Sequence, residues 1–221
     1  MSLPFGSAEF ADVFGAFNAA LWPAVLALWL ISAGVLIAAF RAREPSHRSL
    51  VVLLAFHWSW SALAYHAAYF TRINPAAWLF AGLFLIQGVL FARCALVPGL
   101  LRFSTTRSKW RALAVSLAVF SLAYPIVNVV LGLRFPRMAT FGVPCPTTLL
   151  TLGLLLIAEP RSWVLAAIPV AWALVGGSAA FLLGVQADLM LLVAAALVVG
   201  RLAASRFGLD PAGVSDDVTY N

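Results

Sequence analysis

Seven apolar runs, each close to the length needed to cross a lipid bilayer, constrain the fold of this chain more than any other feature. They lie at about residues 20–40, 50–70, 75–96, 111–133, 144–158, 162–183 and 188–204. Roughly 20 apolar residues in a helix span a hydrocarbon core of about 30 Å. The run at 144–158 is short, and we expect unwound backbone to complete it. The sequence therefore predicts an all-α fold, a polytopic membrane protein with a bundle of seven transmembrane helices.

Composition agrees with this interpretation. Charged residues make up 10% of the chain, against about a quarter in soluble domains. The formal net charge of +6 does not indicate nucleic-acid binding, because the basic residues lie in short connections between apolar runs. Residues 1–20 have no basic segment ahead of an apolar run, so we expect no cleaved signal peptide.

The chain divides into three expected parts. Residues 1–19 are expected to form an interfacial amphipathic helix, with Ser7 as a plausible N-cap. The apolar residues of this helix recur at helical spacing on one face: Phe10, Val13, Phe14 and Phe17. Residues 20–204 form the transmembrane domain, and the polar residues 205–221 read as a short flexible cytoplasmic tail.

The basic residues predict the orientation of the spans. The inner end of the third run and alternate connections hold eleven of the 14 lysines and arginines: Arg41, Arg43, Arg48, Arg93, Arg102, Arg107, Lys109, Arg111, Arg161, Arg201 and Arg206. The other connections hold only Arg72, Arg134 and Arg137. The positive-inside rule therefore places the N-terminus outside and the C-terminus in the cytoplasm.

With this orientation, several polar residues fall at one depth, near the outer leaflet. Polar groups in a bilayer cost free energy unless they are paired or hydrated. We therefore expect a small outer-facing pocket that binds or transports a small neutral molecule or a soft metal ion. The candidate ligand-binding residues are His66, Asn74, Asn128, Cys145, Thr147, Thr148 and Asp188.

The stretch Phe-Gly-Val-Pro-Cys-Pro-Thr-Thr at 141–148 is the centre of the expected pocket. Each proline lacks an N–H and fixes φ, so we expect irregular backbone around Cys145. Cys145 and His66 are the candidate metal ligands, but zinc sites use three or four ligands. The sequence assigns no catalytic residue and leaves any cofactor unknown.

Each candidate also has a structural interpretation. His66 can bond to a neighbouring helix, Cys145 can pack as a small apolar residue, and Asp188 can cap its helix. Asn128 can serve the backbone kinked by Pro125. The hydroxyls of the threonine pair can bond to helix carbonyls.

Two further polar residues, His57 and Gln87, also have structural interpretations. His57, nine residues before His66, faces the opposite way on an unbroken helix, so the two cannot bind one metal ion. We interpret His57 as a packing residue. Gln87, near the middle of its span, is expected to bond to another helix.

Two other classes of function stay open. One is a structural or accessory subunit of a membrane complex, with a membrane-protein partner or as a homo-oligomer. The other is an integral-membrane enzyme, which rests only on the proximity of a thiol, an imidazole and a carboxylate. The single lysine, Lys109, lies in a cytoplasmic connection, which excludes a retinal Schiff base. The chain has no phosphate-binding loop and no HExxH or GxSxG motif.

Several motifs resemble an uncharacterised family of bacterial integral membrane proteins that is catalogued as a domain of unknown function. They are Tyr65-His66, Ile73-Asn74-Pro75-Ala76-Ala77, Gln87 and the stretch at 141–148. The resemblance covers most of the chain, from the Phe-rich helix to the seventh run. It implies a multi-spanning protein of the bacterial inner (plasma) membrane, and it transfers no activity and no site residue.

Overall fold

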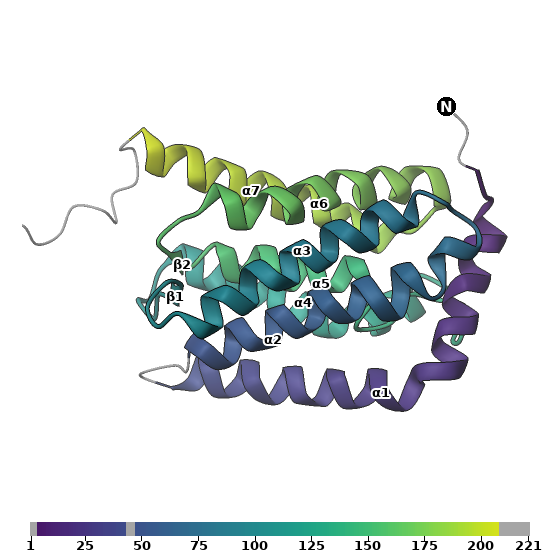
Figure 1. Ribbon diagram of the computed structural model, residues 1–221, viewed down its shortest axis with the longest axis horizontal. Helices are drawn as coiled ribbons and strands as arrows, with labels where there is room; N and C mark the ends of the chain where they lie inside the picture. Colours follow the sequence, from purple (N-terminus) through teal and green to yellow (C-terminus); the bar gives the residue numbers. More distant parts are fainter. Residues whose placement is uncertain (1–3, 43–46, 208–221) are drawn as a thin grey trace, which may run out of the picture.

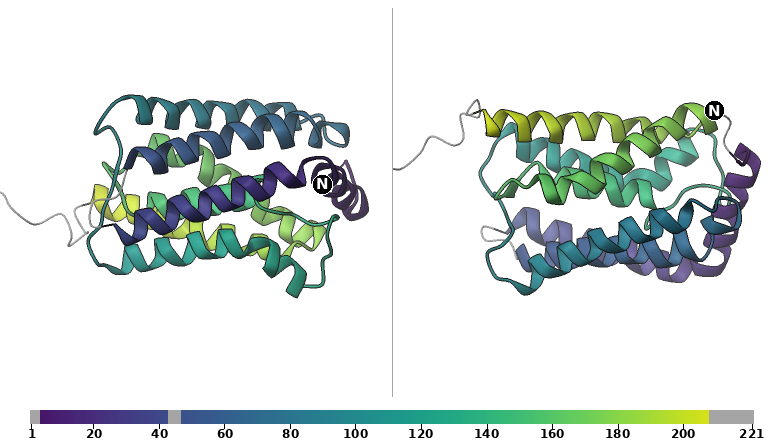
Figure 2. Two further views of the ribbon diagram at one scale, coloured as in Figure 1. Left: turned by 90° about the horizontal axis from the view of Figure 1, so that it is seen from below. Right: turned by 45° about the horizontal axis from the view of Figure 1, so that its top comes forward.

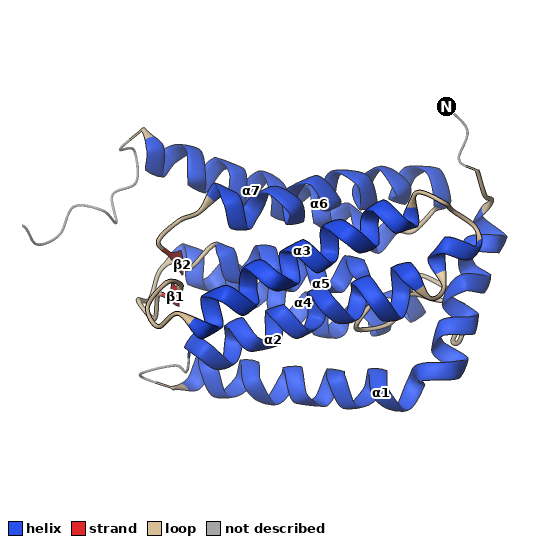
Figure 3. Ribbon diagram, in the orientation of Figure 1, coloured by secondary structure: helices blue, strands red, loops and turns tan. Residues whose placement is uncertain are grey.

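The protein is an all-helical bundle, as the sequence predicts. The computed structural model describes residues 4–42 and 47–207 (Figures 1 and 3). The elements are α1 (Ser7–Arg41), α2 (His47–Trp60), the π-helix η1 (Ser61–Ala67), the 3₁₀-helix η2 (Phe70–Arg72), α3 (Ala77–Leu96), β1 (Arg102–Phe103), α4 (Lys109–Val130), α5 (Pro144–Leu155), β2 (Ala158–Glu159), α6 (Trp163–Leu183), the 3₁₀-helix η3 (Gln186–Asp188) and α7 (Leu189–Arg206). Of the expected tail at 205–221, residues 208–221 lie outside the described residues.

Six segments within the described ranges are long and apolar enough to cross a membrane. They are Ser7–Arg41, His47–Arg72, Ala77–Leu96, Lys109–Val130, Trp163–Leu183 and Gln186–Arg206. Their outward-facing side chains are largely aliphatic and aromatic, which fits contact with a lipid bilayer. The remaining α-helix, α5, has only 12 residues.

Helix α5 lies inside the bundle. It packs against α2, α4, α6 and α7, and all of its residues except Cys145 are buried. A helix that is apolar on every side is stable only when other elements surround it. The expectation of irregular backbone around Cys145 is wrong, because Pro144 and Cys145 open a regular α-helix. Proline is tolerated in a first turn, where the missing N–H has no intrahelical partner.

Alternate connections gather at opposite ends of the bundle. Figure 1 shows β1 and β2 together at the end that also holds the C-terminal end of α7. These strands pair antiparallel, with Arg102 opposite Glu159, so they join the α3–α4 connection to the α5–α6 connection. The opposite end holds the start of α1 and the α6–α7 connection (Figures 1 and 2).

The expected helix at residues 7–19 is the first part of α1. It lies across the end of the bundle, and α1 then bends to run along the bundle (Figure 1). Pro23 lies inside α1 and accounts for a bend in an otherwise continuous helix. The apolar face packs on protein aromatics: the Phe14 ring centroid lies 5.5 Å from that of Tyr65. The N-cap is Gly6, not Ser7, and its N–H donates to Glu9 at 2.8 Å.

Candidate functional site

A small cavity lies at the end of the bundle that α1 crosses. Its volume is about 140 Å³, and it is bounded by residues of α1, η1, η2, the η2–α3 connection, α3, α5, α6 and η3, and by the residues just before α1 and α5. Three of the seven candidate residues line it: Asn74, Cys145 and Asp188. They come from segments that are far apart in the sequence, so the fold alone brings them together.

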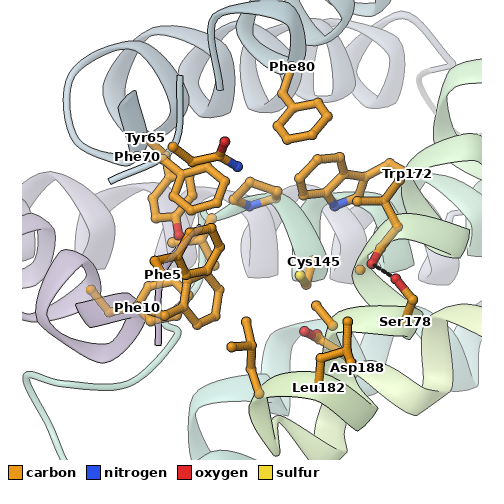
Figure 4. Close-up of a pocket in the computed structure, with 18 residues that line it drawn as sticks. Phe5, Phe10, Tyr65, Phe70, Phe80, Cys145, Trp172, Ser178, Leu182 and Asp188 are labelled. Atoms are coloured by element: carbon orange, nitrogen blue, oxygen red, sulfur yellow. Dashed lines mark hydrogen bonds between the residues drawn. The ribbon is translucent and has the colours of Figure 1, made fainter. Parts of the chain in front are cut away.

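The cavity wall is rich in aromatic side chains. Seven aromatic side chains line it: Phe5, Phe10, Phe14, Tyr65, Phe70, Phe80 and Trp172. Figure 4 shows Phe5 and Phe10 on one side, Phe80 above and Trp172 on the opposite side of the open space. The rings also pack on one another. The centroids of Phe80 and Trp172 are 5.2 Å apart at an interplanar angle of 76°, which is a favourable edge-to-face geometry.

Asp188 supplies the one carboxyl group of the cavity wall. It is 3% exposed, and Figure 4 shows it opposite Phe80. It stands at the N-cap position of α7 but makes no side-chain capping bond. Its Oδ1 instead accepts a hydrogen bond from the buried hydroxyl of Tyr124 on α4. Capping was the structural interpretation of Asp188, and the structure replaces it with a contact between helices.

The thiol of Cys145 lies next to this carboxyl, and Trp172 lies next to Cys145. The Cys145 thiol is free and half-buried, and it lies beside the Asp188 carboxyl group. A Cβ added to Gly176 would lie 3.7 Å from both Cys145 Sγ and Trp172 Nε1. Trp172 Nε1 is buried and meets no hydrogen-bond acceptor at bonding geometry among residues 4–42 and 47–207.

His66 lies behind the aromatic wall and does not line the cavity. Its ring centroid is 5.0 Å from that of Trp172 and 4.6 Å from that of Phe84. Neither ring nitrogen has a hydrogen-bond partner within the described part of the chain. The expected bond to a neighbouring helix is therefore absent from those residues. The π-helix η1 sets this position, since its wider turn changes the direction that following side chains face.

Asn74 combines a turn role with its place at the cavity. The side chain is half-buried, and its Oδ1 accepts from Ala76 N at 3.1 Å. This bond closes a turn of the kind that asparagine favours.

The other three candidate residues have structural roles, and two of them, Asn128 and Thr147, join separate segments. Asn128 Nδ2 donates to the carbonyl of Ala139 at 2.8 Å, which ties α4 to the following connection. Thr148 donates to the Pro144 carbonyl at 2.9 Å, within α5. Thr147 faces α2 and η1. None of the three is among the cavity-lining residues.

A buried polar network surrounds Thr147. Its Oγ1 lies 3.3 Å from both His57 Nδ1 and Ser61 Oγ, and His57 Nε2 lies 2.9 Å from Ser32 Oγ. Ser32 donates its only hydroxyl proton to the Leu28 carbonyl, so Nε2 of His57 must carry the proton of the bond to Ser32. His57 thus joins α1, α2 and α5, which is more than the packing role expected for it.

Sequence reasoning missed the aromatic character of the cavity and the partner of Asp188. The signal for Tyr124 was present, because it lies near the outer end of a predicted span beside Pro125. The aromatic residues of the wall are spread over α1, η1, η2, α3 and α6, and nothing in their spacing connects them. Gln87 behaves as expected: its Nε2 donates to the Leu165 carbonyl on α6 at 3.1 Å.

The donor set at the cavity is limited. Within residues 4–42 and 47–207, no group of three or more His, Cys, Asp or Glu side chains is placed to hold a metal ion. The cavity wall presents one thiol and one carboxyl group, whereas a zinc site takes three or four ligands.

Six segments long and apolar enough to cross a bilayer, together with the buried helix α5, form a helical bundle of a kind compatible with a membrane protein. The chain belongs to a family of unknown function, DUF6064, whose family model matches residues 7–209. This confirms the resemblance to an uncharacterised family. No curated protein matches the chain, and no solved structure matches it.

Proposed function

We propose that this chain is a seven-helix integral protein of the bacterial inner membrane that binds or transports a small organic molecule. In this proposal six helices cross the bilayer, and α5 with its flanking residues carries the chain between the two ends inside the bundle. The N-terminus lies outside and the C-terminus in the cytoplasm, because eleven of the 14 basic residues belong to the connections on one side. The cavity then lies near the outer face.

One observation carries the proposed function. Asn74, Cys145 and Asp188, which belong to three separate segments, converge on one cavity of about 140 Å³. A cavity of about 150 Å³ in another protein holds benzene, so this space accommodates a molecule of similar size. An aromatic wall with a few polar groups is typical of sites for small organic ligands. The thiol and carboxyl group of the wall are too few for a dedicated soft-metal site.

Labelling of Cys145 by a membrane-impermeant maleimide tests this proposal. In a Cys94→Ser background Cys145 is the only thiol. Ala179 lines the cavity, so Ala179→Phe should fill part of it and slow the labelling at least several-fold. Ala171 lies on the same helix, is exposed and does not line the cavity, so Ala171→Phe is the matched control and should leave the rate unchanged.

The labelling result also separates access from transport. Labelling of Cys145 by maleimide added outside intact cells supports an outer-facing cavity. Labelling by maleimide added on either side of the membrane, in separate steps, supports transport. A thiol that never reacts in the folded protein, or equal rates in both phenylalanine variants, would refute the proposed cavity.

A structural or accessory subunit of a membrane complex is the second candidate. The observation that favours it is the hydrogen bonding of Asn128 and Thr147, which holds separate segments of this chain together, while Thr148 bonds within α5. In that case native purification in mild detergent should recover a stoichiometric membrane-protein partner or a homo-oligomer. A monodisperse single chain would argue against it.

A further inference from the structure

Within the described part of the chain, the carboxyl group of Asp188 has no cationic partner. Among residues 4–42 and 47–207, the ion pair that forms is between Arg137 and Asp12, at 2.9 Å, and no lysine, arginine or histidine of these ranges pairs with Asp188. Its side-chain neighbours are the hydroxyl of Tyr124 and the thiol of Cys145. A carboxylate that is 3% exposed is strongly unfavourable unless a positive charge or several donors compensate it.

Two features favour the ionised form of the Asp188 carboxyl group. Tyr124 donates its hydroxyl proton to Asp188 Oδ1, and a hydrogen bond to an ionised acceptor is stronger than one to a neutral acceptor. Asp188 also occupies the N-cap position of the 18-residue helix α7, where the helix dipole favours an anion. Neither feature neutralises the charge, so the cavity beside it is a favourable place for a cation.

The remaining walls suit one kind of cation. Aromatic rings attract a positive charge over their faces, and the attraction grows when the site excludes water. Seven aromatic side chains bound the cavity, and Figure 4 shows rings on several sides of the open space, with Asp188 closing another. A metal ion needs convergent oxygen, nitrogen or sulfur ligands, whereas an alkylammonium group needs apolar contact, ring faces and one counter-charge.

We infer that the cavity binds a small organic ammonium ion, with Asp188 as its counter-charge and the rings of Phe80 and Trp172 among its walls. This inference rests on the proposed function and names its ligand class. The ammonium group belongs either to a free solute or to a phospholipid headgroup that reaches the cavity from the outer leaflet.

Choline and its neutral isostere 3,3-dimethylbutan-1-ol test the inference in the full-length Cys94→Ser protein. The measurement is the rate of Cys145 labelling in maltoside detergent, with sodium chloride at matched ionic strength as a control for salt. We expect choline to slow the labelling at concentrations about tenfold or more below those needed for the alcohol, which corresponds to about 1.4 kcal/mol of charge-dependent binding. Asp188→Asn, which keeps an acceptor for Tyr124, should bring this ratio close to one.

A folding defect in Asp188→Asn does not leave the inference untested. Trp172→Leu keeps an apolar wall but removes a ring face, and it should lower the choline-to-alcohol ratio while the alcohol still binds. Equal protection by choline and the alcohol in the parent protein would overturn the inference. A choline preference that persists in Asp188→Asn at parental labelling rates would overturn it as well. The cavity itself fails if Cys145 never reacts in the folded protein or if Ala179→Phe and Ala171→Phe label alike, so failure of the two proposals is distinguishable.

Reconstitution identifies the source of the ammonium group. Slower labelling in phosphatidylcholine vesicles than in phosphatidylglycerol vesicles, without added solute, assigns the cavity to a lipid headgroup. Equal labelling in both vesicles, together with protection by added choline, assigns it to a free solute. Both results support the ammonium class, and a lack of choline protection in detergent and in both vesicles contradicts it.

Discussion

Gly153→Ala should destabilise the protein, because Gly153 is the one glycine of the central helix α5 and lies where α5 packs closely against α4. A Cβ at this position would lie 2.9 Å from Leu117 Cβ and 3.3 Å from the Ala114 carbonyl oxygen. The first distance is roughly 0.6–1.1 Å shorter than a favourable carbon–carbon contact. Leu117 Cβ is fixed to the backbone, so no rotamer change relieves the overlap and the two helices must separate.

The expected loss follows from two opposing effects. Overpacking of a core costs typically about 1–3 kcal/mol, and we take the upper value because backbone must move. Alanine is preferred over glycine inside a helix by about 1 kcal/mol. The net loss is therefore about 2 kcal/mol of unfolding free energy. For a chain of this size that lowers the thermal midpoint by roughly 4–8 °C.

Gly82→Ala on α3 is the matched control. Gly82 is exposed and has no neighbouring atom within 4 Å of the added Cβ, so only the helix preference acts. Its midpoint should stay level or rise by up to about 4 °C. The assay is thermal unfolding in detergent, followed by size-exclusion chromatography of the soluble fraction. A midpoint for Gly153→Ala at or above that of the parent would refute the close packing of α5 against α4.

Three further predictions concern buried hydrogen bonds and orientation. Thr151 accepts a hydrogen bond from the Trp58 indole N–H at 2.8 Å, so Thr151→Val should lower the unfolding free energy by about 1–3 kcal/mol. The control Thr106→Val, on an exposed loop, should change it by less than about 0.5 kcal/mol. Equal thermal midpoints for the two variants would contradict this prediction. Asn18 Nδ2 donates to the carbonyls of Pro136 and Met138 at 2.7 and 2.8 Å, so Asn18→Leu should speed amide hydrogen exchange in residues 131–143, and unchanged exchange there would count against the contact. A fluorescent protein fused after residue 221 should fluoresce in cells, and alkaline phosphatase fused there should be inactive; the reverse pattern would overturn the predicted orientation.

The sequence by itself determined the class of fold. Apolar runs of span length force helical structure, because a helix satisfies its own backbone hydrogen bonds in hydrocarbon. That argument located the six long helical segments and also the short helix α5. It also placed Asn74, Cys145 and Asp188 at the same end of the bundle, where they line one cavity.

Only the tertiary structure decided which of the polar residues meet. Depth along a span follows from residue number, but the direction of a side chain depends on helix rotation, on the π-turn η1 and on the bend of α1. These placed His66 behind the aromatic wall and turned Thr147 toward His57. The aromatic cavity and the contact between Tyr124 and Asp188 join residues whose sequence separation carries no periodic signal, so packing alone created them.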